Sequence, residues 1–268
     1  MRLFSALLPP ETVLRRVSEV TRELRDLPEA EGLRWTDPAG WHITLAFHGE
    51  CPEDILPELG ERLGRAARRS SPFHLRLAGG GCFGDRVLWL GVVDADPQPV
   101  GGTPAAAGVG DDRAEGNGPA ADAKGKAGAR GRAPGSPTED ASAAQGASEP
   151  GSGRPRPGGA TGRDRPAVRL AEACRAAGAR AGAPHRETAP FRPHLTLARS
   201  RGGAGRGMAV LAGIPGNPIG EVWRVDRLVL IRSELPSGAV PGSGPRYTPL
   251  LARELGTGRA VEAADARL

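Results

Sequence analysis

Residues 42–46 read His-Ile-Thr-Leu-Ala and residues 194–198 read His-Leu-Thr-Leu-Ala, so one five-residue motif occurs twice with a single exchange of isoleucine for leucine. Each copy lies in an apolar run that is typical of a β-strand. Because side chains alternate between the two faces of a strand, the histidine and threonine of each copy are expected on one face. The repeat therefore predicts two similar strands, each presenting an imidazole and a hydroxyl.

The sequence around the two motifs predicts alternating strands and helices. Apolar residues recur at spacings of three and four, which indicates helices over residues 9–27, 53–68 and 168–177. Strands are expected at residues 2–7, 41–47, 73–77, 87–93, 191–198 and 222–231. A turn is expected at Gly79-Gly80-Gly81. This order predicts an α/β or α+β domain.

A low-complexity segment separates the two motifs at residues 101–165. Its only large aliphatic residue is Val109, and it contains no aromatic residue. Such a segment cannot bury enough apolar surface to offset the entropy of ordering it, so we expect a disordered insert. We expect residues 1–100 and 166–255 to form one domain, and residues 256–268 to form a flexible tail.

Composition and cysteine spacing exclude several classes of protein. Cys51, Cys82 and Cys174 are an odd number without CxxC spacing, which argues against a disulfide framework or a zinc knuckle and favours a cytoplasmic protein. No apolar run is long enough to cross a membrane, and the N-terminal stretch is too short for a signal peptide. The net charge of +5 suits an anionic partner such as nucleic acid. Abundant arginine, alanine, glycine and proline also reflect a GC-rich genome, so individual arginines are more informative than the total.

The duplicated histidines suit the cleavage of a cyclic phosphodiester. In-line attack needs a base that deprotonates water and an acid that protonates the departing oxygen on the opposite side of phosphorus. Histidine can take either role because it titrates near neutral pH. The hydroxyls of Thr44 and Thr196 could donate to the non-bridging oxygens where charge accumulates. This chemistry requires no metal or other cofactor, and the sequence offers no convincing carboxylate cage for a metal.

The chain resembles the 2H phosphoesterase superfamily, and within it the RNA 2′,3′-cyclic phosphodiesterases, also called 2′-5′ RNA ligases or LigT-like proteins. The resemblance covers the chain outside the insert. It is carried by Arg2-Leu3-Phe4, Arg34-Trp35, residues 41–50, residues 86–89, residues 191–199 and Gly244-Pro245-Arg246-Tyr247. It implies an α+β bilobal fold, in which two pseudo-symmetric antiparallel sheets with outer helices enclose a central cleft and the two motifs face each other.

The resemblance also implies an activity and roles for the two histidines. The protein would open the 2′,3′-cyclic phosphate at the end of an RNA, or a related cyclic phosphate, to a 2′-phosphomonoester. We also expect a monomer that does not associate with a membrane. By similarity, His42 is the proton donor to the leaving 3′-oxygen and His194 is the proton acceptor that activates water. The residues themselves leave these roles open, because the two motifs are almost the same.

Four further residues are candidates for binding the substrate: Arg192, Arg199, Arg34 and Trp35. Arg192 shares the face of His194, whereas Arg199 has the opposite parity and needs a bend in the strand to reach the phosphate. Arg34 and Trp35 could line the cleft, and Trp35 could stack on a base or belong to the core. We expect Phe47 to pack in the core and His48 to lie in a turn before Gly49.

Two other functions fit the same residues. One is 2′-5′ ligation of RNA ends, which is the reverse reaction with a hydroxyl in place of water. The other is an RNA-binding protein in which the duplicated strands form a binding cleft without turnover.

Overall fold

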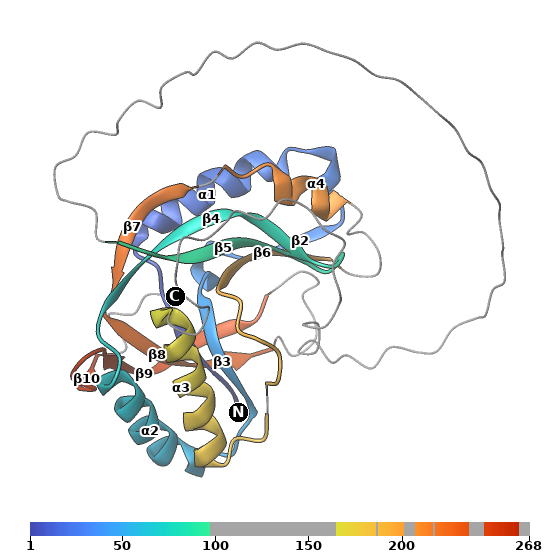
Figure 1. Cartoon of the computed structure of the whole chain (residues 1–268). Coiled ribbons are helices and arrows are strands. Elements are labelled where there is room, and N and C mark those ends of the chain that lie inside the picture. The colour runs from blue at the N-terminus through green and yellow to red at the C-terminus, as the bar shows by residue number, and fades with distance from the viewer. Residues whose placement is uncertain (97–164, 186, 201–206, 217, 236–243, 263–268) are drawn as a thin grey trace, which may run out of the picture. The chain divides into compact units, whose positions relative to one another are not determined.

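The computed structural model describes residues 1–96, 165–185, 187–200, 207–216, 218–235 and 244–262 (Figure 1). These residues belong to one unit, which comprises Met1–Pro97 and Ala144–Leu268. A second unit, Gln98–Ala143, lies outside the described residues. The predicted disordered insert at residues 101–165 also lies outside them, apart from Arg165, which precedes a helix.

The described residues form two five-stranded sheets in which neighbouring strands are antiparallel (Figure 1). Sheet A has the order β10-β9-β8-β1-β3, with strands Ala260–Val261, Arg246–Glu254, Arg227–Glu234, Arg2–Leu7 and Ile43–Glu50. Sheet B has the order β2-β6-β5-β4-β7, with strands Leu33–Trp35, His194–Ser200, Val87–Ala95, Phe73–Phe83 and Ile219–Val225. The first motif therefore lies on an edge strand of sheet A and the second on sheet B.

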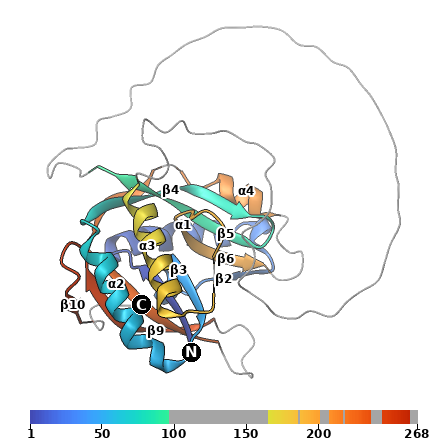
Figure 2. The same ribbon diagram turned by 60° about the horizontal axis from the view of Figure 1, so that its bottom comes forward.

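Helices cover the outer face of each sheet. Helices α1 (Glu11–Arg25) and α4 (Met208–Gly213) pack against sheet B, whereas α2 (Leu56–Arg68) and α3 (Pro166–Ala181) pack against sheet A. The latter two helices lie side by side in both views (Figures 1 and 2). Within the part of the chain that the structure describes, short 3-10 helices occupy Pro28–Ala30, Pro38–Gly40 and Glu53–Ile55. The predicted α+β class with two antiparallel sheets and outer helices is confirmed.

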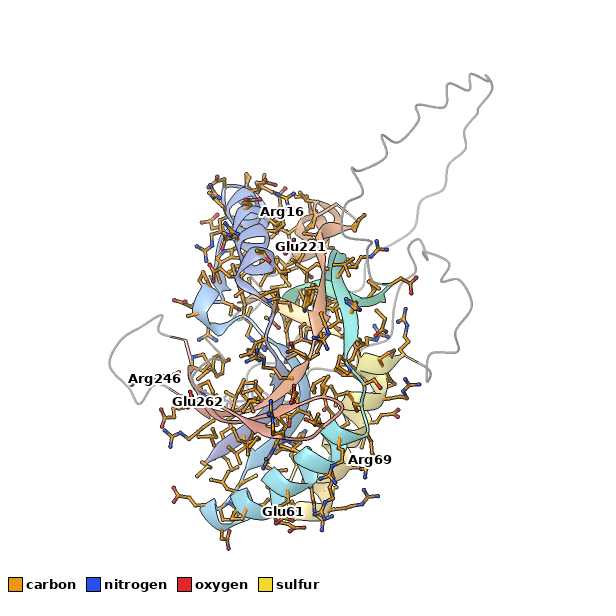
Figure 3. All side chains as sticks on the ribbon, turned by 90° about the vertical axis from the view of Figure 1, so that its left-hand side faces the viewer. Arg16, Glu61, Arg69, Glu221, Arg246 and Glu262 are labelled. Atoms are coloured by element: carbon orange, nitrogen blue, oxygen red, sulfur yellow. The ribbon has the colours of Figure 1, made fainter. Side chains whose placement is uncertain are left out.

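The helices form where the sequence has an apolar stripe. In α1, the residues at spacings of three and four are buried against sheet B: Val13, Val17, Val20 and Leu24. The opposite faces carry charge, with an ion pair of 2.7 Å between Arg16 and Glu19 on α1. Arg16 of α1 and Glu61 of α2 lie on the outside of the molecule (Figure 3). Within the described residues, no helix is both long enough and apolar enough to span a membrane.

Three local predictions are wrong. Residues 222–231 are not one strand, because the chain turns at Asp226 and passes from β7 of sheet B to β8 of sheet A. The glycines at 79–81 lie inside β4 rather than in a turn. There a Cβ on Gly80 would approach the carbonyl oxygen of Ala212 in α4 to 2.6 Å, so glycine allows the helix to pack closely. Within the predicted tail, Ala260–Val261 pair with β9 as strand β10. Residues 263–268 lie outside the described residues.

Both motif strands contain the same irregularity. The register between β1 and β3 skips Leu45, and the register between β5 and β6 skips Leu197. The skipped leucine and the alanine after it are both buried in each strand. Such a bulge exchanges the faces to which later side chains point. The alternation that holds for each His-x-Thr therefore reverses immediately after it.

The bulges change the fate of three residues. Arg199 lies on the same face as His194, because the bulge supplies the bend in the strand that Arg199 needs in order to reach that face. Phe47 does not continue the row of Ile43, but it is half-buried and packs against the smaller core cluster that contains Phe4, so its predicted packing role is confirmed. The prediction that His48 lies in a turn is wrong, because it lies within β3 and its side chain is 2% exposed.

His48 belongs to a buried polar cluster between β1, β3 and α3. Its Nε2 lies 2.7 Å from the hydroxyl oxygen of Ser5, which is fully buried. Burial, assisted by the nearby His185, lowers the pKa of His48 to about 4. Burial also raises the pKa of Cys174 to about 12, against the opposing effect of a hydrogen bond with Ser5. All three cysteines are free. This cluster is electrically neutral at pH 7 and contributes to packing.

Candidate active site

The two motif histidines are held in the same way. His42 Nδ1 lies 2.8 Å from the carbonyl oxygen of Gly40, and His194 Nδ1 lies 2.7 Å from the carbonyl oxygen of Arg192. A carbonyl oxygen only accepts, so Nδ1 carries the proton and donates in each neutral ring. Each Nε2 therefore remains available to accept or donate a proton in catalysis. This duplicated arrangement orients both imidazoles through the residue two positions earlier.

Aromatic rings surround each imidazole. On sheet A, the ring centroid of His42 lies 4.7 Å from that of Phe4 and 5.1 Å from that of Tyr247. On sheet B, the ring centroid of His194 lies 5.0 Å from that of Phe83 and 6.1 Å from that of Trp89. These rings limit the access of water to the two histidines and so disfavour their charged forms.

The threonines of the motifs lie where the repeat predicts. Thr44 and Thr196 are half-buried, and the residues on either side of each are buried. Because the bulges follow the threonines, each hydroxyl is still on the face of its own histidine. The structure thus brings a histidine and a threonine together on each of two strands, and β3 and β6 contact each other where the sheets meet.

Positive charge gathers around the two histidines. Arg199 of β6 interacts electrostatically with both His42 and His194, and also with Arg2 of β1 and Arg34 of β2. Arg34 is the direct cross-strand partner of Arg199, which places both on one face of sheet B. Arginine binds phosphate oxygens through its planar set of donors. The arrangement therefore suits an anionic group between the histidines.

The environment lowers the pKa of both histidines. Burial is the main cause for His42 and lowers its pKa to about 4, against the opposing hydrogen bond to Gly40. The charges of His194 and Arg199 contribute to this lowering. The pKa of His194 is also lowered by burial, opposed by its hydrogen bond to Arg192 and assisted by Arg199. Because a proton on either histidine disfavours a proton on the other, the pair takes up its two protons in separate steps.

Tyr247 and Arg2 belong to this cluster although the sequence assigned them no role. Burial raises the pKa of Tyr247, whereas Arg199, Arg2 and Arg34 lower it. A Cβ on Gly40 would lie 3.1 Å from the tyrosine ring, so glycine allows the ring to approach the residues before His42. The segment containing Tyr247 is part of the resemblance to the family, but no spacing rule connects residue 247 to residue 42.

The four predicted substrate-binding residues differ in their surroundings. Trp35 packs against the core, with the guanidinium of Arg25 5.3 Å from its ring centroid. The side chain of Arg192 is exposed, and this residue contributes to the site through the backbone carbonyl that orients His194. Arg34 and Arg199 are the two candidates that the structure brings to the histidines. Among the described residues, no three His, Cys, Asp or Glu side chains gather as a metal ion would require.

Comparisons with known proteins agree with this geometry. Residues 7–89 match the family model described as LigT like Phosphoesterase. The RNA 2′,3′-cyclic phosphodiesterase of Thermotoga maritima is 34% identical over 100 residues, which are 36% of this chain and 52% of that protein. The protein of the same name from Thermus thermophilus is 37% identical over 102 residues, which are 36% of this chain and 48% of that protein. The matches thus span about half the length of these relatives.

Solved structures match over nearly the whole chain. A crystal structure of a Thermus thermophilus protein is 25% identical, with a TM-score of 0.55, and the match covers 96% of this chain and 98% of that one. The crystal structure of E. coli LigT in apo form has a TM-score of 0.53 at 21% identity, and the match covers 95% of this chain and 96% of that one. The second likeness concerns the fold alone.

Proposed function

Since this chain belongs to the LigT-like phosphoesterase family, we propose that it opens the 2′,3′-cyclic phosphate at the end of an RNA to a 2′-phosphomonoester. The observation that carries this proposal is the pair of equivalently oriented imidazoles, one on each sheet, whose charges interact. A single cyclic phosphate between them would have a proton-transfer group on each side of phosphorus. That is the requirement of an in-line displacement by water.

The reaction uses one proton from water and returns one to the leaving oxygen. His194 Nε2 accepts a proton from the attacking water as its oxygen bonds to phosphorus. The bond between phosphorus and the 3′-oxygen breaks, and His42 Nε2 gives its proton to that oxygen. The product carries a 2′-phosphate and a 3′-hydroxyl, and proton exchange with solvent restores the starting state. Thr44 and Thr196 donate hydrogen bonds to the non-bridging oxygens.

The arginines assist by binding the anion and by setting the protonation of the pair. Arg199, Arg34 and Arg2 give the site a positive potential, which attracts a phosphodiester anion. Once bound, the negative charge of the substrate favours a proton on either imidazole and so raises both pKa values. The role of His42 as donor therefore depends on the substrate, because the pKa of His42 in the ligand-free protein is lowered to about 4, chiefly by burial.

A product assay tests the proposal. Purified protein is incubated with adenosine 2′,3′-cyclic phosphate and with an RNA fragment ending in a 2′,3′-cyclic phosphate, with and without EDTA. We expect 2′-phosphomonoesters as products and equal rates in both conditions, because the two-histidine mechanism needs no metal. Formation of a 2′-5′ linkage between RNA fragments without hydrolysis would favour ligation, and RNA binding without either product would favour a binding protein. Either result would contradict the proposal.

The dependence of kcat/KM on pH is the next expected result. Activity requires that one histidine of the pair is protonated and the other is neutral. The pH dependence of kcat/KM reports the pKa values of the pair in the free protein. Because both pKa values are lowered below 6.5, the singly protonated pair becomes rarer as the pH rises above that value. We expect a bell-shaped profile with its maximum on the acidic side of pH 6.5, and a maximum in kcat at higher pH because bound substrate raises both pKa values.

The variant Arg199→Gln provides the matched test of this electrostatic account. Arg199 lowers the pKa of both histidines, so its removal should move the kcat/KM maximum toward higher pH while weakening phosphate binding. The Arg165→Gln variant is the control, since Arg165 pairs with Asp94 at the start of α3. A kcat/KM that stays level or rises between pH 6.5 and pH 8 in the wild type would refute the assignment.

A further inference from the structure

A patch of sheet B beside His194 carries almost no side chains. In the pairing of β5 with β6, Gly91 lies opposite His194 and Trp89 lies opposite Thr196. In the pairing of β4 with β5, Gly81 lies opposite Trp89. Directly paired residues of an antiparallel sheet project on the same face. The face that presents His194 and Thr196 is therefore bare at both glycines, and Trp89 lies between them.

The indole ring of Trp89 lies over the bare patch with one of its faces against the sheet. A Cβ placed on Gly81 would be 2.1, 2.3 and 2.5 Å from three atoms of its six-membered ring. Three such similar distances mean that the position lies above the plane of the ring, because an approach to its edge would leave two of the atoms much farther away. Only glycine permits this arrangement. The opposite face of the indole points away from the sheet, and Trp89 is half-buried.

Phe83 extends this aromatic surface. Its ring centroid lies 5.2 Å from that of Trp89 with 41° between the planes, and 5.0 Å from that of His194. Phe83 has the same parity as Gly81 in β4, so it lies on the same face, and it too is half-buried. The two rings thus form a surface immediately beside one of the two proton-transfer groups.

Sheet A presents a different set of rings beside His42. There Phe4 is 4% exposed, and its ring is tilted by 33° at 4.7 Å from His42 itself. Phe4 is thus buried, and the half-buried Tyr247 is turned edge-on to His42, with 81° between the two rings and 5.1 Å between their centroids. The two sides of the histidine pair therefore differ: beside His194 two half-buried rings lie on a bare part of the sheet, whereas beside His42 one ring is buried and the other is turned edge-on. This difference would make the site asymmetric toward a ligand that has an aromatic ring at one end.

We propose that Trp89 and Phe83 bind the nucleobase of the nucleotide whose cyclic phosphate lies between His42 and His194, so that this surface selects nucleotides over base-free cyclic phosphates. The inference rests on the proposed function and adds a specificity-determining site to it. A base is joined to the phosphate through a single ribose, so a phosphate at His194 places the base within reach of these rings. Stacking on an aromatic side chain tolerates every base, which suits RNA ends of any sequence.

The test compares two substrates of which only one has a base: adenosine 2′,3′-cyclic phosphate and the 2,3-cyclic phosphate of 1-O-methylribose. In the Trp89→Leu variant, we expect KM for the adenosine substrate to rise by about tenfold or more, with kcat changed little, because base stacking on one ring has about this effect. Both constants for the base-free substrate should stay close to their wild-type values, because leucine keeps an apolar side chain beside His194. The Trp89→Phe variant should have a KM for the adenosine substrate close to that of the wild type. The Gly81→Ala variant, in which the new methyl group displaces the indole, should show the same rise in KM as Trp89→Leu.

Two controls separate stacking from a structural role. Phe191→Leu removes a half-buried ring that packs on Arg175 of α3, and it should affect neither substrate selectively. In the wild type, adenosine 2′-monophosphate should quench tryptophan fluorescence whereas inorganic phosphate should not. This measurement does not depend on whether any variant folds. Equal losses for both substrates, or no change for either, would overturn the inference. If the wild type hydrolyses neither substrate, the proposed function itself fails and the inference fails with it.

Discussion

Replacing His42 or His194 with alanine is expected to lower kcat for adenosine 2′,3′-cyclic phosphate by about a hundredfold to ten-thousandfold, since each variant loses one proton-transfer step. Both side chains are half-buried at the surface between the sheets, and each makes a hydrogen bond to a nearby backbone carbonyl. Their removal leaves the buried core untouched, so both variants should unfold at temperatures close to that of the wild type. Steady-state rates and a thermal melt measure the two effects.

The two variants should respond differently to the leaving group. In a phosphodiester of 4-nitrophenol, the leaving group departs as the phenolate and needs no proton. On this substrate, the activity of the variant that lacks the acid should therefore approach that of the wild type. We expect that recovery in His42→Ala and its absence in His194→Ala, which would assign the donor and the acceptor. Recovery in the other variant would reverse the roles. His74→Ala on β4 is the matched control and should retain full activity, whereas near-normal rates in both motif variants would refute two-histidine catalysis.

Replacing Gly178 with alanine is expected to destabilise the protein, although alanine is the better helix former. A Cβ at this position in α3 would lie 2.3 Å from Nδ1 and 2.9 Å from Cε1 of the buried His48. The imidazole is held by Ser5 and cannot move away easily. Helix propensity would add about 1 kcal/mol and overpacking would cost more than that, so we expect the free energy of unfolding to fall by about 2 kcal/mol. Urea denaturation at pH 7.5 measures the change.

A matched glycine variant and a double variant test the cause. A Cβ on Gly213 of α4 would meet nothing within 4 Å, so Gly213→Ala should leave stability unchanged or raise it. Combining Gly178→Ala with His48→Ala should cost less than the sum of the two single changes, because the clash requires both partners. Strict additivity, or a stabilised Gly178→Ala variant, would show that α3 adjusts and that the close approach is unimportant.

The sequence predicted those parts of the fold and site that depend on local periodicity. The stripe of α1 and the His-x-Thr alternation both follow from side-chain direction within one element, and both agree with the structure. The prediction failed one residue after each threonine, because a bulge depends on the partner strand rather than on the strand itself. His48 and Arg199 were misplaced or left uncertain for that single reason.

Residues that reach the site from distant strands were beyond prediction for a different reason. Arg2 and Tyr247 join the histidines only because β1 and β9 both flank β8 in sheet A, and no pattern within either segment indicates that order. The glycines at 79–81 indicated a turn, whereas their use is to let Trp89 and α4 approach β4. A close approach of this kind depends on which residues pack against the glycine, and the sequence around the glycine does not indicate which residues these are.

The order of strands in sheet A has a consequence for how the protein is made. Strand β1 is synthesised first but lies between β3 and β8, and β8 comes only at Arg227–Glu234. While the ribosome is still translating the middle of the chain, the edge of β1 that will pair with β8 has no partner, and Phe4 lacks Ile231 and Tyr247 around it. His42 therefore acquires its surroundings only during the last part of translation. Until then, the unpaired backbone N–H and C=O groups along this edge of β1 must be kept from pairing with another strand.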